Sequence, residues 1–264
     1  MSVVLQISDP HFGTEVPEVV QALARLATRL EPDLVVLSGD ITQRARASQF
    51  EAAKAFMSRI DAPLLAVPGN HDIPLMNLWA RFAHPYANHS ASFGEALEPR
   101  FESRELLVLG VNTTRARRHK NGEVDATQMR RVAEQLRHAN ADQLRVVVVH
   151  QPIEVKRQQD EPDRLIGHAA AQRAWAVAGA DIVMGGHIHL PYVMALPGLE
   201  RPMWAVQAGT AVSSRVRRGV PNSVNVLRWS AVEGTCMVEQ WDHSGTKHVF
   251  EKVHTTRLEV ARPA

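Results

Sequence analysis

Residues that can bind metal ions or transfer protons recur directly after short apolar runs of this chain. Carboxylate and imidazole groups are the ligands that hard to borderline divalent metals such as Mn, Fe and Zn take in proteins. A carboxylate can bridge two ions, and such a pair, about 3.5–4 Å apart, can clamp a phosphate and activate water. The residues in question are Asp9, His11, Asp40, Asn70, His71, Asp72, His150, His187 and His189.

Taken singly, these signals are weak, because a histidine after a strand is more often structural than a ligand and Gly-Asp is a common turn. Here five separate segments end in this way, so a chance origin would require several ordinary explanations at once. Gly39, Gly69, Gly185 and Gly186 lie beside the set and permit tight turns that bring the backbone close to a site. The pattern therefore predicts one shared metal site.

The apolar runs that precede these residues predict strands buried on both faces, since they do not alternate with polar residues. Stretches of helical period lie between them, and this alternation indicates an α/β sheet protein. In open sheets of this kind, sites form outside the carboxyl ends of the strands. The expected strands are 3–7, 34–37, 64–67, 106–111, 146–149 and 182–184, and the expected helices 16–30, 47–60, 126–139 and 164–178.

The pattern changes after residue 190, where strand-like runs at 193–196, 203–206, 224–229 and 235–241 follow one another without helices. We expect a single domain over 1–264, in which 190–254 forms an antiparallel β extension of the second sheet. The exposed edge of such an extension would be available for homodimer formation.

The composition excludes several classes of protein. The chain has 264 residues, of which 45% are hydrophobic and 22% charged, as in ordinary globular domains. A net charge of +2 gives no reason to expect a nucleic-acid partner, and the single cysteine, Cys236, excludes an intramolecular disulfide and a cysteine zinc site. With no apolar run of about 20 residues and no leader-like N-terminus, we expect a cytoplasmic protein that does not contact membranes.

The order of Asp9-Pro10-His11, Gly39-Asp40, Gly69-Asn70-His71-Asp72, His150 and Gly186-His187-Ile188-His189 resembles the calcineurin-like metallophosphoesterases. The match covers residues 3–189 and is most similar to the compact bacterial branch that includes cyclic-nucleotide phosphodiesterases and glycerophosphodiesterases. Pro10 stands where other residues are more usual, but it is not a ligand. The resemblance implies a four-layer α/β/β/α sandwich of two mixed sheets flanked by helices.

The resemblance also implies a dinuclear centre of two divalent ions, or of Fe(III) with a divalent ion, drawn from Mn, Fe, Zn and Co. By it, one ion is held by Asp9, His11, Asp40 and His189, with Asp40 bridging, and the second is completed by Asn70, His150 and His187. His71 would face the substrate and stabilise or protonate the leaving group, while Asp72 would orient the His71 ring.

The resulting functional prediction is a phosphodiesterase that hydrolyses a small diester by in-line attack of a metal-bound hydroxide. A 3',5'-cyclic nucleotide is the preferred substrate on the basis of the family branch alone. The alternatives are a glycerophosphodiesterase, a phosphomonoesterase, a nucleotide-lipid pyrophosphatase and, more remotely, a non-catalytic scaffold. The intact set of ligand-type residues argues against the scaffold.

Three stretches could form the rim of the site. Residues 77–94 would shape the pocket, or Trp79 and Phe82 would simply belong to the core. The basic stretch from Arg115 to Lys120, and the turn 210–219 with Arg215, Arg217 and Arg218, could attract phosphate or be solvated turns. A nuclease of this kind would need further DNA-binding elements.

Overall fold

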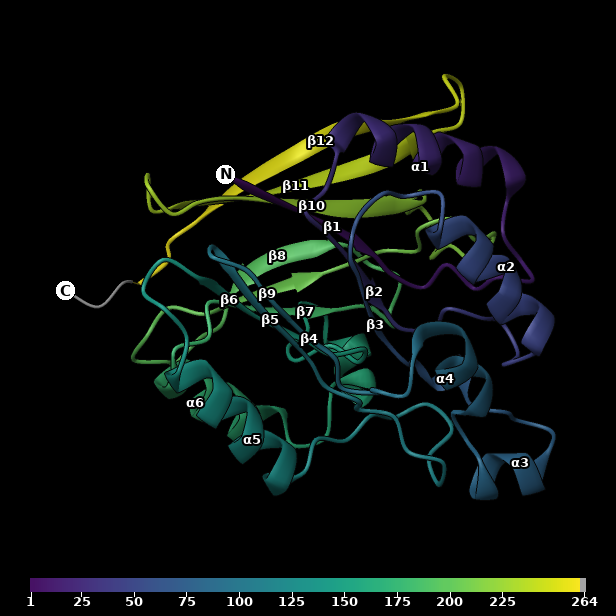
Figure 1. Cartoon of the computed structure of the whole chain (residues 1–264), viewed down its shortest axis with the longest axis horizontal. Helices are drawn as coiled ribbons and strands as arrows, with labels where there is room; N and C mark the ends of the chain where they lie inside the picture. Colours follow the sequence, from purple (N-terminus) through teal and green to yellow (C-terminus); the bar gives the residue numbers. More distant parts are fainter. Residues whose placement is uncertain (262–264) are drawn as a thin grey trace.

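Two six-stranded sheets form the centre of the molecule, and helices cover their outer faces (Figure 1). The computed structural model describes residues 1–261. The first sheet has the strand order β12-β11-β10-β1-β2-β3. Its strands are β1 (Ser2–Ile7), β2 (Leu34–Ser38), β3 (Leu64–Val67), β10 (Ser223–Ser230), β11 (Thr235–Ser244) and β12 (Val249–Leu258).

The second sheet has the order β4-β5-β6-β7-β9-β8. Its central strands run parallel, whereas β4 and β8 are antiparallel to their neighbours, and the first sheet is likewise parallel across β1-β2-β3 and antiparallel beyond β1. Both sheets are therefore mixed. The strands are β4 (Arg100–Glu102), β5 (Leu106–Gly110), β6 (Leu144–Val148), β7 (Ile182–Gly185), β8 (Tyr192–Ala195) and β9 (Trp204–Gln207).

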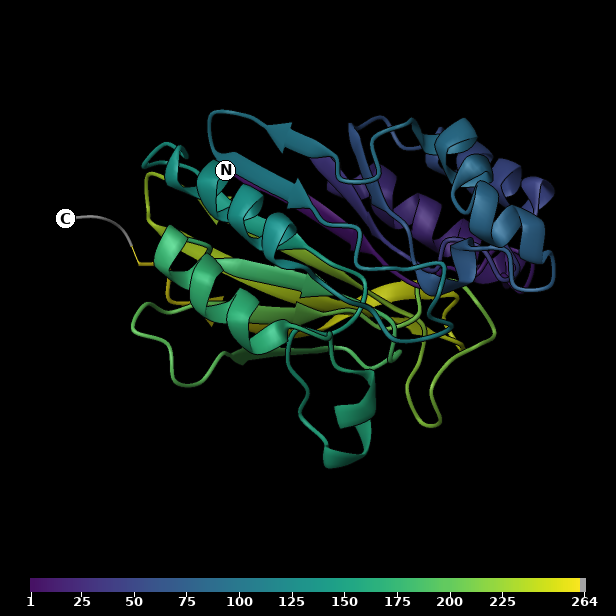
Figure 2. The same ribbon diagram turned by 90° about the horizontal axis from the view of Figure 1, so that it is seen from below.

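The helices are α1 (Pro17–Leu30), α2 (Ala47–Met57), α3 (Leu78–Ala83), α4 (Ala87–Phe93), α5 (Ala126–Arg137) and α6 (His168–Ala178). The apolar faces of α1 and α2 pack against the first sheet, and those of α5 and α6 against the second. α5 and α6 lie side by side over their sheet (Figure 2). Asp125 caps the N-terminus of α5 through the backbone N–H groups of Thr127 and Gln128, which satisfies donors that a helix start leaves free.

Strand β2 shows why the runs are apolar without interruption. Val35 and Leu37 pack into the core beneath α1 and α2, while Leu34 and Val36 point into the core between the two sheets. Because successive side chains of a strand face opposite sides, a central strand of a four-layer protein must be apolar on both. The predicted α/β/β/α sandwich is confirmed.

The C-terminal strands do not all lie where we expected them. Residues 190–254 were expected to extend the second sheet, but only β8 and β9 do so, and β9 runs parallel to β7. Strands β10–β12 instead extend the first sheet, with β10 antiparallel to β1 and Leu5 opposite Val226. This position buries Val226 beneath the helices and Leu227 between the sheets. The sequence of such a strand indicates that the side chains on both of its faces are buried. It does not indicate which edge of which sheet the strand joins.

None of the helices within residues 1–261 has both the length and the apolar character that crossing a membrane requires.

Candidate metal centre

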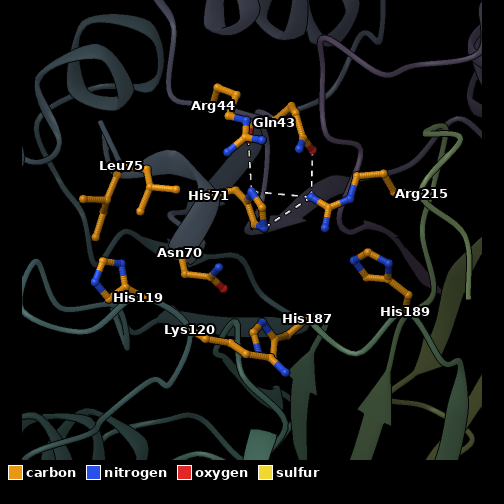
Figure 3. Close-up of a pocket in the computed structure, with 11 residues that line it drawn as sticks. Gln43, Arg44, Asn70, His71, Leu75, His119, Lys120, His187, His189 and Arg215 are labelled. Atoms are coloured by element: carbon orange, nitrogen blue, oxygen red, sulfur yellow. Dashed lines mark hydrogen bonds between the residues drawn. The ribbon is translucent and has the colours of Figure 1, made fainter. Parts of the chain in front are cut away.

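A cavity of about 390 Å³ lies where the carboxyl ends of strands from both sheets meet. Most of its lining side chains are polar, and Figure 3 shows His71 near its centre, with Asn70, His187 and His189 around it. The short 3₁₀ helix Asn70–Asp72, which follows β3, carries Asn70 and His71 to this position. The predicted convergence of residues from separate strands is thus present in the fold.

Six of the predicted ligands form two clusters, and within each the ligand atoms lie no more than 4.8 Å apart. Asp40 faces both clusters, because its Oδ2 lies 3.9 Å from Nε2 of His11 and its Oδ1 lies 3.3 Å from Nε2 of His150. One carboxylate is therefore placed between the two groups. The clusters are Asp9, His11 and His189, and Asp40, His150 and His187.

Several buried polar atoms of the centre fit the requirements of metal ligands. The Oδ1 atom of Asn70 has no hydrogen-bond partner, although buried polar atoms normally find one. Nδ1 of His150 lies 2.9 Å from the Ser38 carbonyl, which can only accept, so Nδ1 carries a proton and Nε2 is the nitrogen that a metal ion could bind. Nε2 of His11 and Nε2 of His189 lie 3.1 Å apart, close enough for both nitrogens to bind one cation.

The electrostatics of the centre favour a cation. Burial opposes the ionisation of Asp9, but the hydrogen bond and charge of His189 outweigh it and lower the pKa of Asp9 to about 2. For Asp40, burial is outweighed by the charge of His150 and the hydrogen bond to it, and the pKa falls well below its usual value. Burial disfavours the charged form of His150, yet Asp40 outweighs it and raises the pKa of His150 to about 9. Two buried carboxylates are thus ionised at neutral pH and require positive partners.

The backbone at the predicted ligands adopts an uncommon conformation. Among residues 1–261, eight non-glycine residues have a positive φ, and five of them belong to this set. Such conformations are costly and persist where the surroundings impose them, which occurs preferentially at functional sites. The five are Asp9 (φ 49°), His11 (φ 43°), Asp40 (φ 47°), His187 (φ 74°) and His189 (φ 54°).

Glycine is required where two of these segments approach each other. A Cβ atom at Gly186 would collide with the hydroxyl of Ser8 and a carboxylate oxygen of Asp9. The same carboxylate accepts hydrogen bonds from Ser8 Oγ at 2.6 Å and from the His187 backbone N–H at 2.9 Å. The absence of a side chain at Gly186 therefore lets the β1 and β7 ends lock Asp9 in position.

One predicted role is wrong. Asp72 was expected to orient the ring of His71, but its carboxylate accepts hydrogen bonds from the backbone N–H groups of Gly69, Ile41 and Thr42 instead. Asp72 thereby ties the turn after β3 to the turn after β2. Burial and the nearby charge of Asp40 raise the pKa of Asp72 to about 6.

The His71 ring is held by two residues that the sequence analysis did not assign to it. Its Nδ1 lies 3.0 Å from the backbone carbonyl of Gln43, and its Nε2 lies 3.2 Å from Nη1 of Arg215 (Figure 3). The basic character of the turn around Arg215 was the available signal, whereas nothing in the sequence distinguished Gln43. Arg215 also reaches the first cluster, since its backbone is hydrogen-bonded to His189.

The other basic side chains of the rim are mostly paired. Arg117 and Arg118 both bind Glu123, Arg217 binds Asp160, and Lys120 binds Asp163 while still lining the cavity. Of the two basic stretches, only His119, Lys120 and Arg215 line it. The alternative in which Trp79 and Phe82 belong to the core is wrong, because they are 72% and 64% exposed.

Comparisons with known proteins agree with this geometry. A stretch of 72 residues is 35% identical to the UDP-2,3-diacylglucosamine pyrophosphatase LpxG of Chlamydia muridarum, covering 26% of this chain and 22% of that protein. A stretch of 79 residues is 35% identical to the glycerophosphodiester phosphodiesterase GpdQ of Enterobacter lignolyticus, covering 25% and 28%. The similarity thus spans about a quarter of these curated relatives.

The fold is similar to that of the purple acid phosphatase PPD1 from yellow lupin, with a TM-score of 0.72 and 13% identity over 97% of this chain and 53% of that one. The family model described as calcineurin-like phosphoesterase matches residues 2–191, which include every predicted ligand. The resemblance seen in the motifs is confirmed, and the chain belongs to the calcineurin-like phosphoesterase family.

Proposed function

We propose that the chain is a dinuclear metal-dependent phosphodiesterase. The observation that carries the proposal is the position of Asp40, whose two carboxylate oxygens face separate clusters of ligand-type side chains. Asp9, His11 and His189 would hold one ion together with Asp40, and Asn70, His150 and His187 would hold the other together with Asp40. The imidazole, carboxylate and amide donors suit Mn, Fe, Zn or Co.

When bound, the two ions would polarise the phosphoryl oxygens and supply an activated water at neutral pH. The chain's own residues bind and orient the substrate. Lys120 and Arg215 both line the cavity and complement an anionic phosphate, and the His71 ring lies next to the Arg215 guanidinium (Figure 3). His71 stabilises the charge that develops on the leaving oxygen, since its ring lies in the cavity and outside both clusters.

A diester is the favoured substrate class. The relatives that match carry the names of a pyrophosphatase and a glycerophosphodiester phosphodiesterase, and both names denote substrates whose phosphate is substituted at two oxygens. The cavity, with a volume of about 390 Å³, leaves room for a phosphate that carries a second substituent. A small diester such as a 3',5'-cyclic nucleotide is the first substrate to test.

The test is a substrate panel on protein reconstituted with Mn²⁺, comparing bis-p-nitrophenyl phosphate, p-nitrophenyl phosphate, cyclic nucleotides and glycerophosphodiesters. We expect a higher kcat/KM for the bis ester than for the monoester, and about two ions per chain by elemental analysis. Asp40→Asn should lower the occupancy of both ions, whereas the exposed-site control Asp61→Asn should retain both. Equal or reversed preference would assign the chain to the phosphomonoesterases, and a stoichiometry of one would exclude the dinuclear centre.

A further inference from the structure

A segment beside the cavity exposes an unusual density of large apolar side chains. Five of them lie between residues 75 and 82, and no eight-residue stretch in the rest of residues 1–261 exposes more than two. Isolated apolar residues are common on protein surfaces, but a contiguous group marks an interaction site. This apolar strip consists of Leu75 (39% exposed), Met76 (87%), Leu78 (63%), Trp79 (72%) and Phe82 (64%).

Helix α3, which carries most of the strip, is inverted relative to an ordinary surface helix. Its buried residue is Arg81, whereas Leu78, Trp79 and Phe82 face outward. The guanidinium of Arg81 donates to the backbone carbonyls of Pro74 and Arg118, so it fastens the segment to the loop that carries His119 and Lys120. Helices normally bury the apolar face and expose the charge. The outward apolar face is therefore imposed by specific contacts and is not a packing defect.

The strip is continuous with the cavity. Of the side chains that line the cavity, the two apolar ones are Ile73 and Leu75, and both lie on the segment that leads into α3. In Figure 3, Leu75 lies on the side of His71 away from Arg215. The cavity is thus lined mainly by polar and cationic side chains and opens onto an apolar surface at Leu75.

Resting on the proposed function, we propose that the strip binds an apolar chain of the substrate, so that the enzyme acts on amphiphilic phosphoesters. The charge distribution favours this occupant, because Arg44, Lys120 and Arg215 complement the anionic phosphate while the adjoining strip complements an alkyl or acyl chain attached to it. The alkyl or acyl chain of the substrate would leave the cavity past Leu75 and lie along Met76 and Trp79.

The experiment measures binding by titration calorimetry of the Mn²⁺-loaded protein with methyl, butyl and octyl phosphate, below the concentrations at which octyl phosphate forms micelles. We expect affinity to rise about twofold for each added methylene, which corresponds to half of the free energy that complete burial of a methylene contributes. The four methylenes from butyl to octyl should therefore raise affinity roughly tenfold or more. The triple variant Met76→Ser, Trp79→Ser, Phe82→Ser should bind methyl phosphate as the wild type does and lose the gain for octyl phosphate. Val232→Ser, at a 95% exposed position outside the strip, is the matched control and should leave the series unchanged.

Equal affinity for all three ligands, or an octyl gain that survives in the triple variant, would overturn the inference. The rival occupant of the strip is a second copy of the protein, and light scattering after gel filtration tests it. If the wild type is a dimer and the triple variant a monomer, the strip is a dimer interface and the inference is overturned. Hydrolysis of octyl p-nitrophenyl phosphate separates the two proposals. Chain-length-dependent binding without hydrolysis of any ester would leave the strip as an amphiphile site and refute the phosphodiesterase.

Discussion

The guanidinium of Arg215 contacts the imidazole of His71, with Nη1 of Arg215 3.2 Å from Nε2 of His71. Because the Gln43 carbonyl can only accept, Nδ1 of His71 carries the proton of that hydrogen bond, and Nε2 faces both Arg215 and the cavity. The side-chain oxygen of Gln43 accepts a further hydrogen bond from Arg215, at 2.7 Å. Gln43 therefore orients both groups, and Arg215 presents its remaining N–H donors to the cavity.

Arg215→Ala should lower kcat/KM for phosphodiesters by about 10- to 100-fold, the usual effect of losing a hydrogen bond to a charged group. Arg215→Lys should recover only part of the lost activity, because the lysine ammonium lacks the planar array of N–H donors with which arginine can bind His71, Gln43 and a phosphate together. Steady-state kinetics at constant metal content measure both variants. Arg218→Ala, at an exposed position of the same turn, should retain full activity. An Arg215→Ala enzyme with wild-type kinetics would remove this residue from substrate binding.

His71→Ala should keep nearly the full metal content and lose about 10²–10³ in kcat, because it removes the imidazole that faces the developing charge without removing a ligand. Asn70→Ala, one residue earlier, should instead lower the occupancy of one ion. Elemental analysis and kinetics on the same preparations distinguish the two. If His71 protonates the leaving oxygen, the loss should be smaller for p-nitrophenyl esters, whose leaving group needs little protonation. The division of labour is refuted if His71→Ala loses metal and Asn70→Ala does not.

Gly186→Ala should displace the carboxylate of Asp9, since the added methyl occupies the space of Asp9 and Ser8. We expect the metal content to fall from two ions towards one, activity to fall with it, and unfolding by urea to show a loss of about 1–3 kcal/mol from overpacking. Gly245→Ala is the control, because a methyl group there meets no atom within 4 Å. Full metal content in Gly186→Ala would show that the close approach is not needed.

His89 should make the protein sensitive to mild acid. It lies 1% exposed between the rings of Phe50 and Phe93, and burial lowers its pKa from 6.5 to about 4. The unfolded chain takes up a proton near pH 6.5 and the folded chain only near pH 4, so stability is complete above pH 6.5 and is lost as the pH falls towards 4. Urea unfolding at pH 7 and pH 5 should show that His89→Leu loses about 2 kcal/mol less than the wild type over this interval. Identical losses in the two proteins would contradict the assignment.

The sequence supported the layers and the position of the site because each depends on local pattern. Runs such as 34–37 are apolar at every position, which only a strand between two cores explains. The polar residues after such strands meet because parallel strands end at one edge. The sheet edge that β10 joins could not be predicted, because a strand with apolar side chains on both faces fits the edge of either sheet. Nor could the contact between Arg215 and His71, which depends on how two loops 144 residues apart pack together.

The left-handed backbone at Asp9, His11, Asp40, His187 and His189 implies a conflict between activity and durability. Glycine adopts this conformation without the steric penalty that a Cβ brings, so a glycine at His187 would relax the backbone while removing a ligand. Selection for thermal stability alone would therefore favour variants of this protein that have lost ligands and activity. Stabilising substitutions therefore have to leave these five positions unchanged and be sought elsewhere, for example in strands β11 and β12 of the first sheet.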